Sequence, residues 1–386
     1  MMRVIRRMGP SKNAILSETI TKALQGIQFA RGVLTGDTAH AGPFFVTVDV
    51  THRCNLRCLS CRFHSPEITQ MKAAPDDGDA QDVPYALVLR LCDELKCLGT
   101  RRLVLIGEGE PLMHPHIIDI ISTAKAAGLG VFLVTNGTLL DEKMAHTLVA
   151  SGLDTIQVSL WASSPEDYER NHPGTPATMF NRVVRGVQLL SSHKSAQATK
   201  RPRVVLHHPI GRNDVDHVER FAELALATGC DHVSFSPLLT DRGKLGAQAL
   251  TADEEVSLRS SLGRLRTRLR GQPVRHNINE LLRRYETGSA VWNEYPCYIG
   301  WIDARVKPDG NVVPCNPCDL VMGNLHVNSL REIWNGAAYR AFRRRTLSRE
   351  GLRDLGTHCD CEFCCHLMAN RRLHSVFRAL APFMRG

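Results

Sequence analysis

The chain has 386 residues, which is long enough for two domains and for a sizeable buried core without disulfides. With 43% apolar and 23% charged residues its composition is that of an ordinary globular protein, and no run of about 18 apolar residues is present that could cross a membrane. The net charge of +9 fits an anionic membrane surface or an acidic substrate. No nucleic-acid reader motif accompanies this charge, so we expect no nucleic-acid partner.

The basic residues gather near both ends of the chain and in a third group formed by Arg340, Arg343, Arg344 and Arg345. The basic start is not followed by an apolar signal core, and 13 cysteines would be a liability in an oxidising compartment. We therefore expect a cytoplasmic protein, and the basic ends raise the further expectation of peripheral membrane contact.

From residue 44 to about residue 240, short apolar runs alternate with amphipathic helical patterns. One such pattern runs from Leu87 to Leu98 and is ended by Gly99; another begins at Asp141. Strands are predicted at Phe45–Val50, Leu103–Ile106, Val131–Val134, Thr155–Leu160, Val204–His208 and His232–Phe235. Strand–helix repeats of this length predict an α/β fold, with a parallel sheet curled into a full or partial barrel.

Chemically distinctive residues follow the first four predicted strands. Cys54, Cys58 and Cys61 form a CxxxCxxC pattern after the first strand, Gly107-Glu108-Gly109-Glu110-Pro111 follows the second, Thr135-Asn136-Gly137 follows the third, and Ser159 closes the fourth. In barrels of this kind the loops after the strands carry the chemistry. We therefore expect all of these residues at one mouth of the barrel.

Three cysteines in one tight loop can bind three irons of a four-iron cluster and leave the fourth iron open to a substrate or cosubstrate. A structural zinc site is the alternative, and His52 or His64 could supply its fourth ligand. Disulfides are disfavoured because nothing in the chain indicates secretion.

After the predicted barrel the pattern of residues changes twice. Residues 241–290 read as a helical connector, which Thr251 and Glu254 would begin as a capping box. Its predicted buried stripe consists of Val256, Leu262, Leu265 and Leu269. Beyond it lies a cysteine-rich second domain. Arg372 to Met384 form an amphipathic basic helix that could lie on an anionic membrane or dock onto the barrel of the chain.

Taken together, the CxxxCxxC loop, the GEGEP turn and the TNG turn resemble the radical S-adenosylmethionine (SAM) enzymes. The Cys297-x12-Gly310-x4-Cys315 segment, the stretches 322–325 and 329–335, and Cys361-x2-Cys364 are similar to the SPASM domain of that family. The resemblance implies a partial (β/α)6 TIM-like barrel with a small cysteine-rich SPASM or twitch domain. The expected units are a basic extension (1–43), the barrel core (44–240), the connector (241–290), the SPASM-type domain (291–366) and the basic helix (367–386).

The resemblance also implies the chemistry and the residues that serve it. In these enzymes a three-cysteine [4Fe-4S] cluster binds SAM, cleaves it reductively, and yields a 5′-deoxyadenosyl radical that takes a hydrogen atom from the substrate. By the same resemblance the residues expected to contact SAM are Gly109, Glu110, Asn136, Ser159 and Gly211. Ser60 departs from the family, which often has an aromatic residue near the adenine at this position.

The second domain is expected to hold one auxiliary [4Fe-4S] cluster on Cys297, Cys315, Cys361 and Cys364. Cys318 and Cys359 are reserve ligands for a possible second cluster, and Cys365 is a bystander. The alternative is a zinc ribbon, because a tetrahedral thiolate site suits either metal.

Many peptide-modifying members of the family carry a separate peptide-binding domain, and the residues before the barrel are too few for one. From this we expect a small-molecule, sugar or lipid-linked substrate, a net oxidation or rearrangement, and a flavodoxin or ferredoxin-type electron donor. The alternatives are an enzyme that modifies a ribosomally made peptide or protein, and a noncatalytic iron–sulfur or zinc scaffold or electron carrier.

Overall fold

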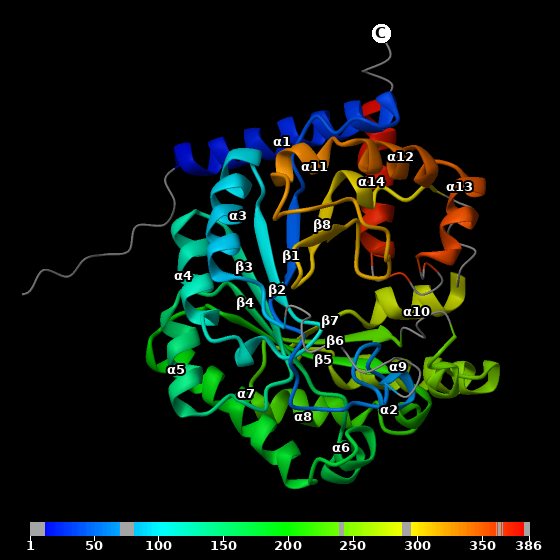
Figure 1. Cartoon of the computed structure of the whole chain (residues 1–386). Coiled ribbons are helices and arrows are strands. Elements are labelled where there is room, and N and C mark those ends of the chain that lie inside the picture. Colours follow the sequence, from blue (N-terminus) through cyan, green and yellow to red (C-terminus); the bar gives the residue numbers. More distant parts are fainter. Residues whose placement is uncertain are drawn as a thin grey trace, which may run out of the picture.

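The computed structural model describes residues 12–69, 81–238, 243–287, 295–359, 361, 364 and 366–381, with side chains from residue 23 onward. Six parallel strands follow one another in chain order and each pairs with the next (Figure 1). They are β1 (Phe45–Asp49), β2 (Arg102–Ile106), β3 (Gly130–Thr135), β4 (Thr155–Ser159), β5 (Arg203–Ile210) and β6 (His232–Pro237). All six predicted strands are therefore confirmed, and so is the predicted α/β partial barrel.

Helices cover the outer face of these strands, as Figure 1 shows for α3, α4, α5, α7 and α8. The helices of this region are α2 (Pro66–Thr69), α3 (Tyr85–Leu98), α4 (Ile117–Ala126), α5 (Glu142–Ala150), α6 (Pro165–Asn171), α7 (Thr178–Ala196) and α8 (Arg220–Thr228). α3 buries Leu87, Leu91 and Leu95 and ends at Gly99, whose φ of 72° favours glycine. Asp141 caps α5 by accepting a hydrogen bond from the Met144 amide at 2.8 Å.

The sheet continues beyond the six predicted strands at both edges. β7 (Arg275–His276) joins β6, and β8 (Asp303–Val306) from the C-terminal region pairs in parallel with β1. β9 (Asn311–Val313) and β10 (Gly323–Asn324) complete a ten-stranded sheet by antiparallel pairing. The cysteine-rich region is thus joined to the barrel by backbone hydrogen bonds, and it reaches the barrel mouth.

The connector consists of α9 (Ala252–Arg268) and α10 (Ile278–Thr287). Thr251 and Glu254 form the predicted capping box at the start of α9. Leu262, Leu265 and Leu269 of the predicted stripe are buried, whereas Val256 is 61% exposed, so its assignment to the stripe is wrong. The helical repeat carries the buried face back from Leu262 by four residues to Leu258, and position 256 lies on another side of the helix.

The N- and C-terminal helices α1 (Lys12–Thr35) and α14 (Leu367–Leu380) pack against each other (Figure 1). α14 also docks on Tyr298, whose amide donates to the Asn370 side-chain oxygen at 2.6 Å and whose hydroxyl lies 2.8 Å from Nδ1 of His374. The structure therefore shows this helix docked on the protein, and the surface that receives it is formed by α1 and Tyr298 and not by the predicted barrel. Phe383 and Met384 lie outside the described residues, and none of the helices in the described ranges is long and apolar enough to cross a membrane.

The remaining helices belong to the second domain. They are α11 (Leu330–Trp334), α12 (Ala337–Thr346) and α13 (Arg349–Asp354). Short 3-10 turns lie in this domain at Ile299–Trp301 and Leu355–Thr357, and earlier in the chain at Pro111–Met113, Arg212–Asp214 and Gly246–Gln248. α12 carries the third basic group of the sequence, but Arg343 is fully buried and does not contribute to a basic surface. Its guanidinium donates to the backbone oxygens of Gly300 and Trp334 at 2.7 and 2.6 Å. The same group lies 4.7 Å from the Trp334 ring centre, and burial lowers its pKa to about 10.

We expect Arg343→Ala to destabilise the fold by about 3 kcal/mol or more, because several buried carbonyl oxygens lose their donor and the ring of Trp334 loses its cation. Urea unfolding followed by circular dichroism measures this change. Arg344→Ala is the matched control, since that side chain is largely exposed and should matter much less. Equal effects of the two substitutions would contradict the structural role of Arg343.

Candidate active site

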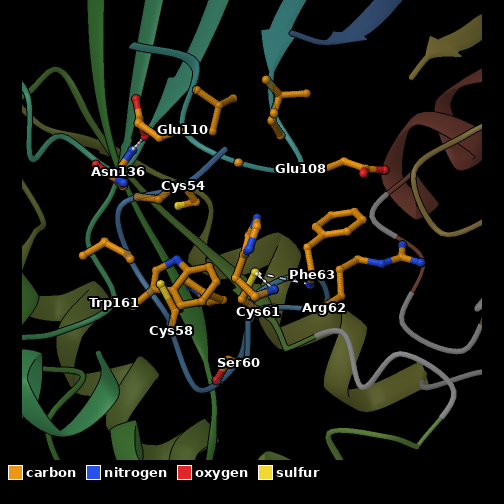
Figure 2. Close-up of a pocket in the computed structure, with 18 of the residues that line it drawn as sticks. Cys54, Cys58, Ser60, Cys61, Arg62, Phe63, Glu108, Glu110, Asn136 and Trp161 are labelled. Atoms are coloured by element: carbon orange, nitrogen blue, oxygen red, sulfur yellow. Dashed lines mark hydrogen bonds between the residues drawn. The ribbon is translucent and has the colours of Figure 1, made fainter. Parts of the chain in front are cut away.

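A cavity of about 300 Å³ opens at the carboxyl end of the parallel strands (Figure 2). Each of the six strands, or the loop after it, contributes to its wall, and so does the C-terminal region. The contributors include Cys54, Glu110, Asn136, Ser159, His207, Ser236, Arg305 and Asn316. The structure therefore brings together at one mouth the residues that the sequence predicts there.

The three cysteines of the CxxxCxxC pattern occupy the loop after β1, and all three line the cavity. The amide of Cys61 donates to the carbonyl oxygen of Cys58 at 3.1 Å, which forms a tight turn. The sulfur of Cys61 accepts hydrogen bonds from the amides of Phe63 and His64 at 3.4 and 3.3 Å (Figure 2). Such donors stabilise negative charge on sulfur, which is the form that ligates a metal.

The electrostatics of these thiols indicate that they need a positive partner. Burial, reinforced by the neighbouring thiols, raises the pKa of Cys54 to about 11 and the pKa of Cys58 well above its ordinary value. Three thiolates would therefore not form together in this cavity without a compensating charge, and bound iron supplies such a charge. Among the described residues no three Cys, His, Asp or Glu side chains converge on a point where a single metal ion would bind. An iron–sulfur cluster is larger than one ion, so the thiolates around it stand farther apart.

The GEGEP turn after β2 lies directly against the cysteine loop. The amide of Gly109 donates to the Thr51 oxygen at 2.9 Å, and the amide of Glu110 donates to the Arg53 oxygen at 2.8 Å. A Cβ atom at position 109 would collide with the Arg53 carbonyl group. Glycine at this position is therefore required to bring the two loops together, and a contact of Gly109 with SAM stays a prediction.

Glu110 is almost completely buried in the wall of the cavity. Its carboxylate accepts hydrogen bonds from the Thr135 hydroxyl and the Asn136 amide, both at 2.6 Å, and from the Leu112 amide at 3.0 Å. Burial raises its pKa, and these donors counteract the rise. Its predicted contact with the amino group of SAM is compatible with this position and remains a prediction.

Asn136 connects the turn after β3 to the cysteine loop. Its side-chain amide donates to the Asn55 side-chain oxygen at 2.9 Å, and Asn55 in turn donates to the Thr138 hydroxyl at 2.8 Å. The Asn136 side-chain oxygen accepts from the same hydroxyl at 2.7 Å. This closed network fixes the cysteine loop from a second side.

The other two predicted SAM contacts differ in their placement. Ser159 lines the main cavity, whereas Gly211 lines a smaller cavity beside it. Both cavities share Ser60, Trp161 and Pro209 in their walls, so the two spaces adjoin.

Charged contacts between the barrel and the C-terminal region form a further part of the site that the sequence did not predict. Arg305 of β8 donates to both carboxylate oxygens of Asp49 at 2.6 Å, and both side chains are buried. Glu108 lies 2.9 Å from Nδ1 of His52 and forms an ion pair with Lys307 of the C-terminal region. No local sequence signal reveals the contacts of Arg305 and Lys307, because their partners lie about 200 residues or more away in the chain.

Some of the aromatic and histidine residues near the barrel mouth line the cavity, and others are buried against neighbouring side chains. His207 faces the cavity and burial lowers its pKa to about 4, so its ring is neutral near pH 7. His208 is buried and lies 3.1 Å from Asp214, while His172 stacks on Tyr168 with ring centres 4.0 Å apart. Trp161 also lines the cavity, although it was not among the predicted site residues. Its position two residues after Ser159, at the end of a predicted strand, could have indicated that it lies at the barrel mouth.

Several of the described cysteines of the C-terminal region lie next to one another in pairs. Cys297 is buried next to Cys361, and burial together with that neighbour raises its pKa to about 12. The amide of Cys364 donates to the Cys361 oxygen at 3.3 Å, and that of Cys318 donates to the Cys315 oxygen at 3.4 Å. The assignment of Cys297, Cys315, Cys361 and Cys364 to one auxiliary cluster stays a prediction.

Cys318 and Cys359, the predicted reserve ligands of a second cluster, are joined by a disulfide. Because iron is ligated by thiolates, these two could serve as the predicted reserve ligands only in the reduced form. Cys365 lies outside the described residues.

Comparisons with known proteins identify the family. The model of the radical SAM superfamily matches residues 48–241, which is half of the chain, and the SPASM model, an iron–sulfur cluster-binding domain, matches residues 297–366. The chain therefore belongs to the radical SAM superfamily and carries a C-terminal SPASM domain. It uses SAM and a SAM-binding [4Fe-4S] cluster, and its SPASM domain binds auxiliary iron–sulfur.

Individual relatives are more distant. The PqqA peptide cyclase of Ruegeria pomeroyi is 28% identical over 330 residues, which cover 78% of this chain and 76% of the relative. The AdoMet-dependent heme synthase of Methanosarcina barkeri is 26% identical over 311 residues, which cover 76% of this chain and 83% of the relative. Streptococcus suis SuiB bound to S-adenosylmethionine has a similar fold, with a TM-score of 0.65 at 13% identity over 93% of this chain and 80% of SuiB.

The expectation of a small-molecule, sugar or lipid-linked substrate is contradicted by these comparisons. Peptide cyclases are found repeatedly among the relatives, and SuiB has also been solved with its precursor peptide. The expectation depended on the small number of residues before the barrel. That number gives no information about which substrate the cavity accepts.

We expect Gly109→Ala to separate the GEGEP turn from the cysteine loop, because the added methyl group would overlap the Arg53 carbonyl. After anaerobic reconstitution the variant should lack about one four-iron cluster per chain, measured as protein-bound iron. Gly263→Ala is the control, since a Cβ at that helical position meets nothing within 4 Å. Equal iron content in the two variants would contradict the role given to Gly109.

Proposed function

We propose that this protein is a radical SAM/SPASM enzyme that modifies a peptide, as a maturase of a ribosomally made peptide or protein. The observation that carries the proposal is the similarity to the PqqA peptide cyclase of Ruegeria pomeroyi, which covers 78% of this chain. The fold of SuiB, solved with its precursor peptide SuiA, supports the same reading with a TM-score of 0.64.

The cavity supports this proposal because both parts of the chain build it. The three-cysteine loop and the strand ends of the barrel form one wall, and Arg305 and Asn316 of the C-terminal region form another. Arg62 of the cysteine loop donates to the Asn316 backbone oxygen at 2.8 Å, which ties the two walls together. A substrate in this cavity would therefore lie between the SAM site and the auxiliary-cluster domain.

The bound cluster and SAM would supply the one-electron cleavage chemistry of the superfamily, and the chain's own residues would hold and shield it. Cys54, Cys58 and Cys61 would be the ligands. Glu110 and Asn136 would present a fixed polar wall to the amino-acid part of SAM, since both are locked by hydrogen bonds. Neutral His207 would offer a proton acceptor at the cavity wall.

A net oxidation of the peptide would suit the SPASM domain beside this cavity. One electron would leave with the abstracted hydrogen atom, an auxiliary cluster held there would supply an acceptor for the second electron, and a base such as His207 would take the remaining proton. We infer that a flavodoxin or ferredoxin-type protein delivers the electron that starts each turnover. The net oxidation and the electron donor go beyond what family membership shows, and the net oxidation depends on the peptide proposal.

The SAM chemistry is tested separately from the substrate. The anaerobically reconstituted protein with dithionite and SAM should release 5′-deoxyadenosine, and the variant Cys54→Ala/Cys58→Ala/Cys61→Ala should release none while it keeps its auxiliary iron. Cys97→Ala, at an exposed position of α3, should behave as the unaltered protein. A fully iron-loaded protein that releases no 5′-deoxyadenosine would favour the noncatalytic alternative.

The peptide substrate is tested by co-expression with a short peptide encoded next to the gene of this protein. We expect the peptide to lose two hydrogen atoms in mass spectrometry when the enzyme is intact, and to be unmodified with the triple cysteine variant. An enzyme that cleaves SAM but leaves the mass of the peptide unchanged would contradict a net oxidation of this substrate.

A further inference from the structure

Trp161 is the largest side chain that faces the cavity, and no role has yet been given to it. It lies two residues after the end of β4 and lines the main cavity together with Cys58 and Ser60 (Figure 2). It also lines the small adjoining cavity, again with Ser60. Ser60 adds only a small side chain to the part of the wall that the two cavities share with Trp161.

The orientation of the ring gives the cavity an apolar surface. Trp161 is half-buried, and its nitrogen Nε1 is completely buried in the wall. The part of the indole that remains accessible is therefore carbon. A flat carbon surface of this kind favours stacking with another planar ring system.

The other aromatic rings of the cavity wall already have close partners. The Phe63 ring lies 5.3 Å from the charged group of Arg62 and 5.3 Å from that of Lys307. The His64 ring lies 5.1 Å from the ring of His52. For Trp161 the nearest ring contact in the described part of the chain is His172, at 6.4 Å.

The two halves of SAM make different demands on the cavity. The methionine half carries an amino group and a carboxylate, which need polar partners such as Glu110 and Asn136. The adenosine half carries a planar purine, whose faces stack on aromatic side chains. Figure 2 shows Trp161 in a part of the wall separate from Glu110 and Asn136.

We propose that Trp161 is the positioning residue on which the purine of SAM stacks. The inference depends on SAM use by this chain and not on the identity of the peptide substrate, so the two can fail independently. By holding the adenosine half, Trp161 would fix the direction in which the sulfonium of SAM approaches the open iron.

The test measures equilibrium binding of three probes to the anaerobically reconstituted protein: SAM, 5′-deoxyadenosine and methionine. Trp161→Leu should weaken SAM and 5′-deoxyadenosine by about tenfold, as loss of a stacked base does, and leave methionine binding unchanged. Trp161→Phe keeps an aromatic ring and should stay within about threefold of the unaltered protein.

Tyr85→Leu is the matched control, because it removes a ring that stacks on His116 away from the cavity wall and should not alter 5′-deoxyadenosine binding. Protein-bound iron is measured for every variant, so that a loss of the cluster is recognised. The proposal is overturned if Trp161→Leu binds 5′-deoxyadenosine as well as the unaltered protein does. It is also overturned if both Trp161 variants lose all three probes equally at full iron content.

Discussion

Three thiol groups confined to one half-buried cavity are the constraint on which the rest of this structure depends. Burial raises the pKa values of Cys54 and Cys58, and the neighbouring Cys61 thiol raises them further, so the negative forms of these two thiols require a positive partner in the same space. Iron meets that requirement, and a loop that offers only three ligands leaves coordination for a cosubstrate. The chemistry of the chain thus follows from the number of cysteines and from the cavity in which they stand.

The surrounding structure holds that loop in place from several directions. Backbone hydrogen bonds from Gly109 and Glu110 fasten its beginning, and Asn136 fastens Asn55 within it. β1, the strand that leads into the loop, lies between β2 and β8, and the buried pair of Asp49 and Arg305 joins it to the C-terminal region. A buried ion pair of this kind has a demanding geometry, so it fixes the position of the second domain relative to the cysteine loop.

Much of the barrel and its site could be predicted because their signals are local. Parallel strands buried on both faces give continuous apolar runs, and the functional residues follow those runs at short distances along the chain. The pairing of β8 with β1 could not be predicted, because about 250 residues separate them and neither strand encodes its partner. The burial of Arg343 could not be predicted for a related reason. Its charge suggested an exposed basic surface, whereas carbonyl groups and rings from other parts of the chain surround its guanidinium. The substrate could not be predicted either, since the number of residues before the barrel says nothing about what the cavity accepts.

The central claim is that one iron at the barrel mouth is open and binds SAM. Electron paramagnetic resonance tests it most directly on a variant in which Cys297, Cys315, Cys361 and Cys364 are replaced by alanine, which removes the predicted ligands of the auxiliary cluster and keeps the CxxxCxxC loop. We predict that adding SAM to the reduced variant changes the spectrum of that cluster. A spectrum that is unaltered by saturating SAM, or a loop that holds zinc in place of iron, would contradict the account.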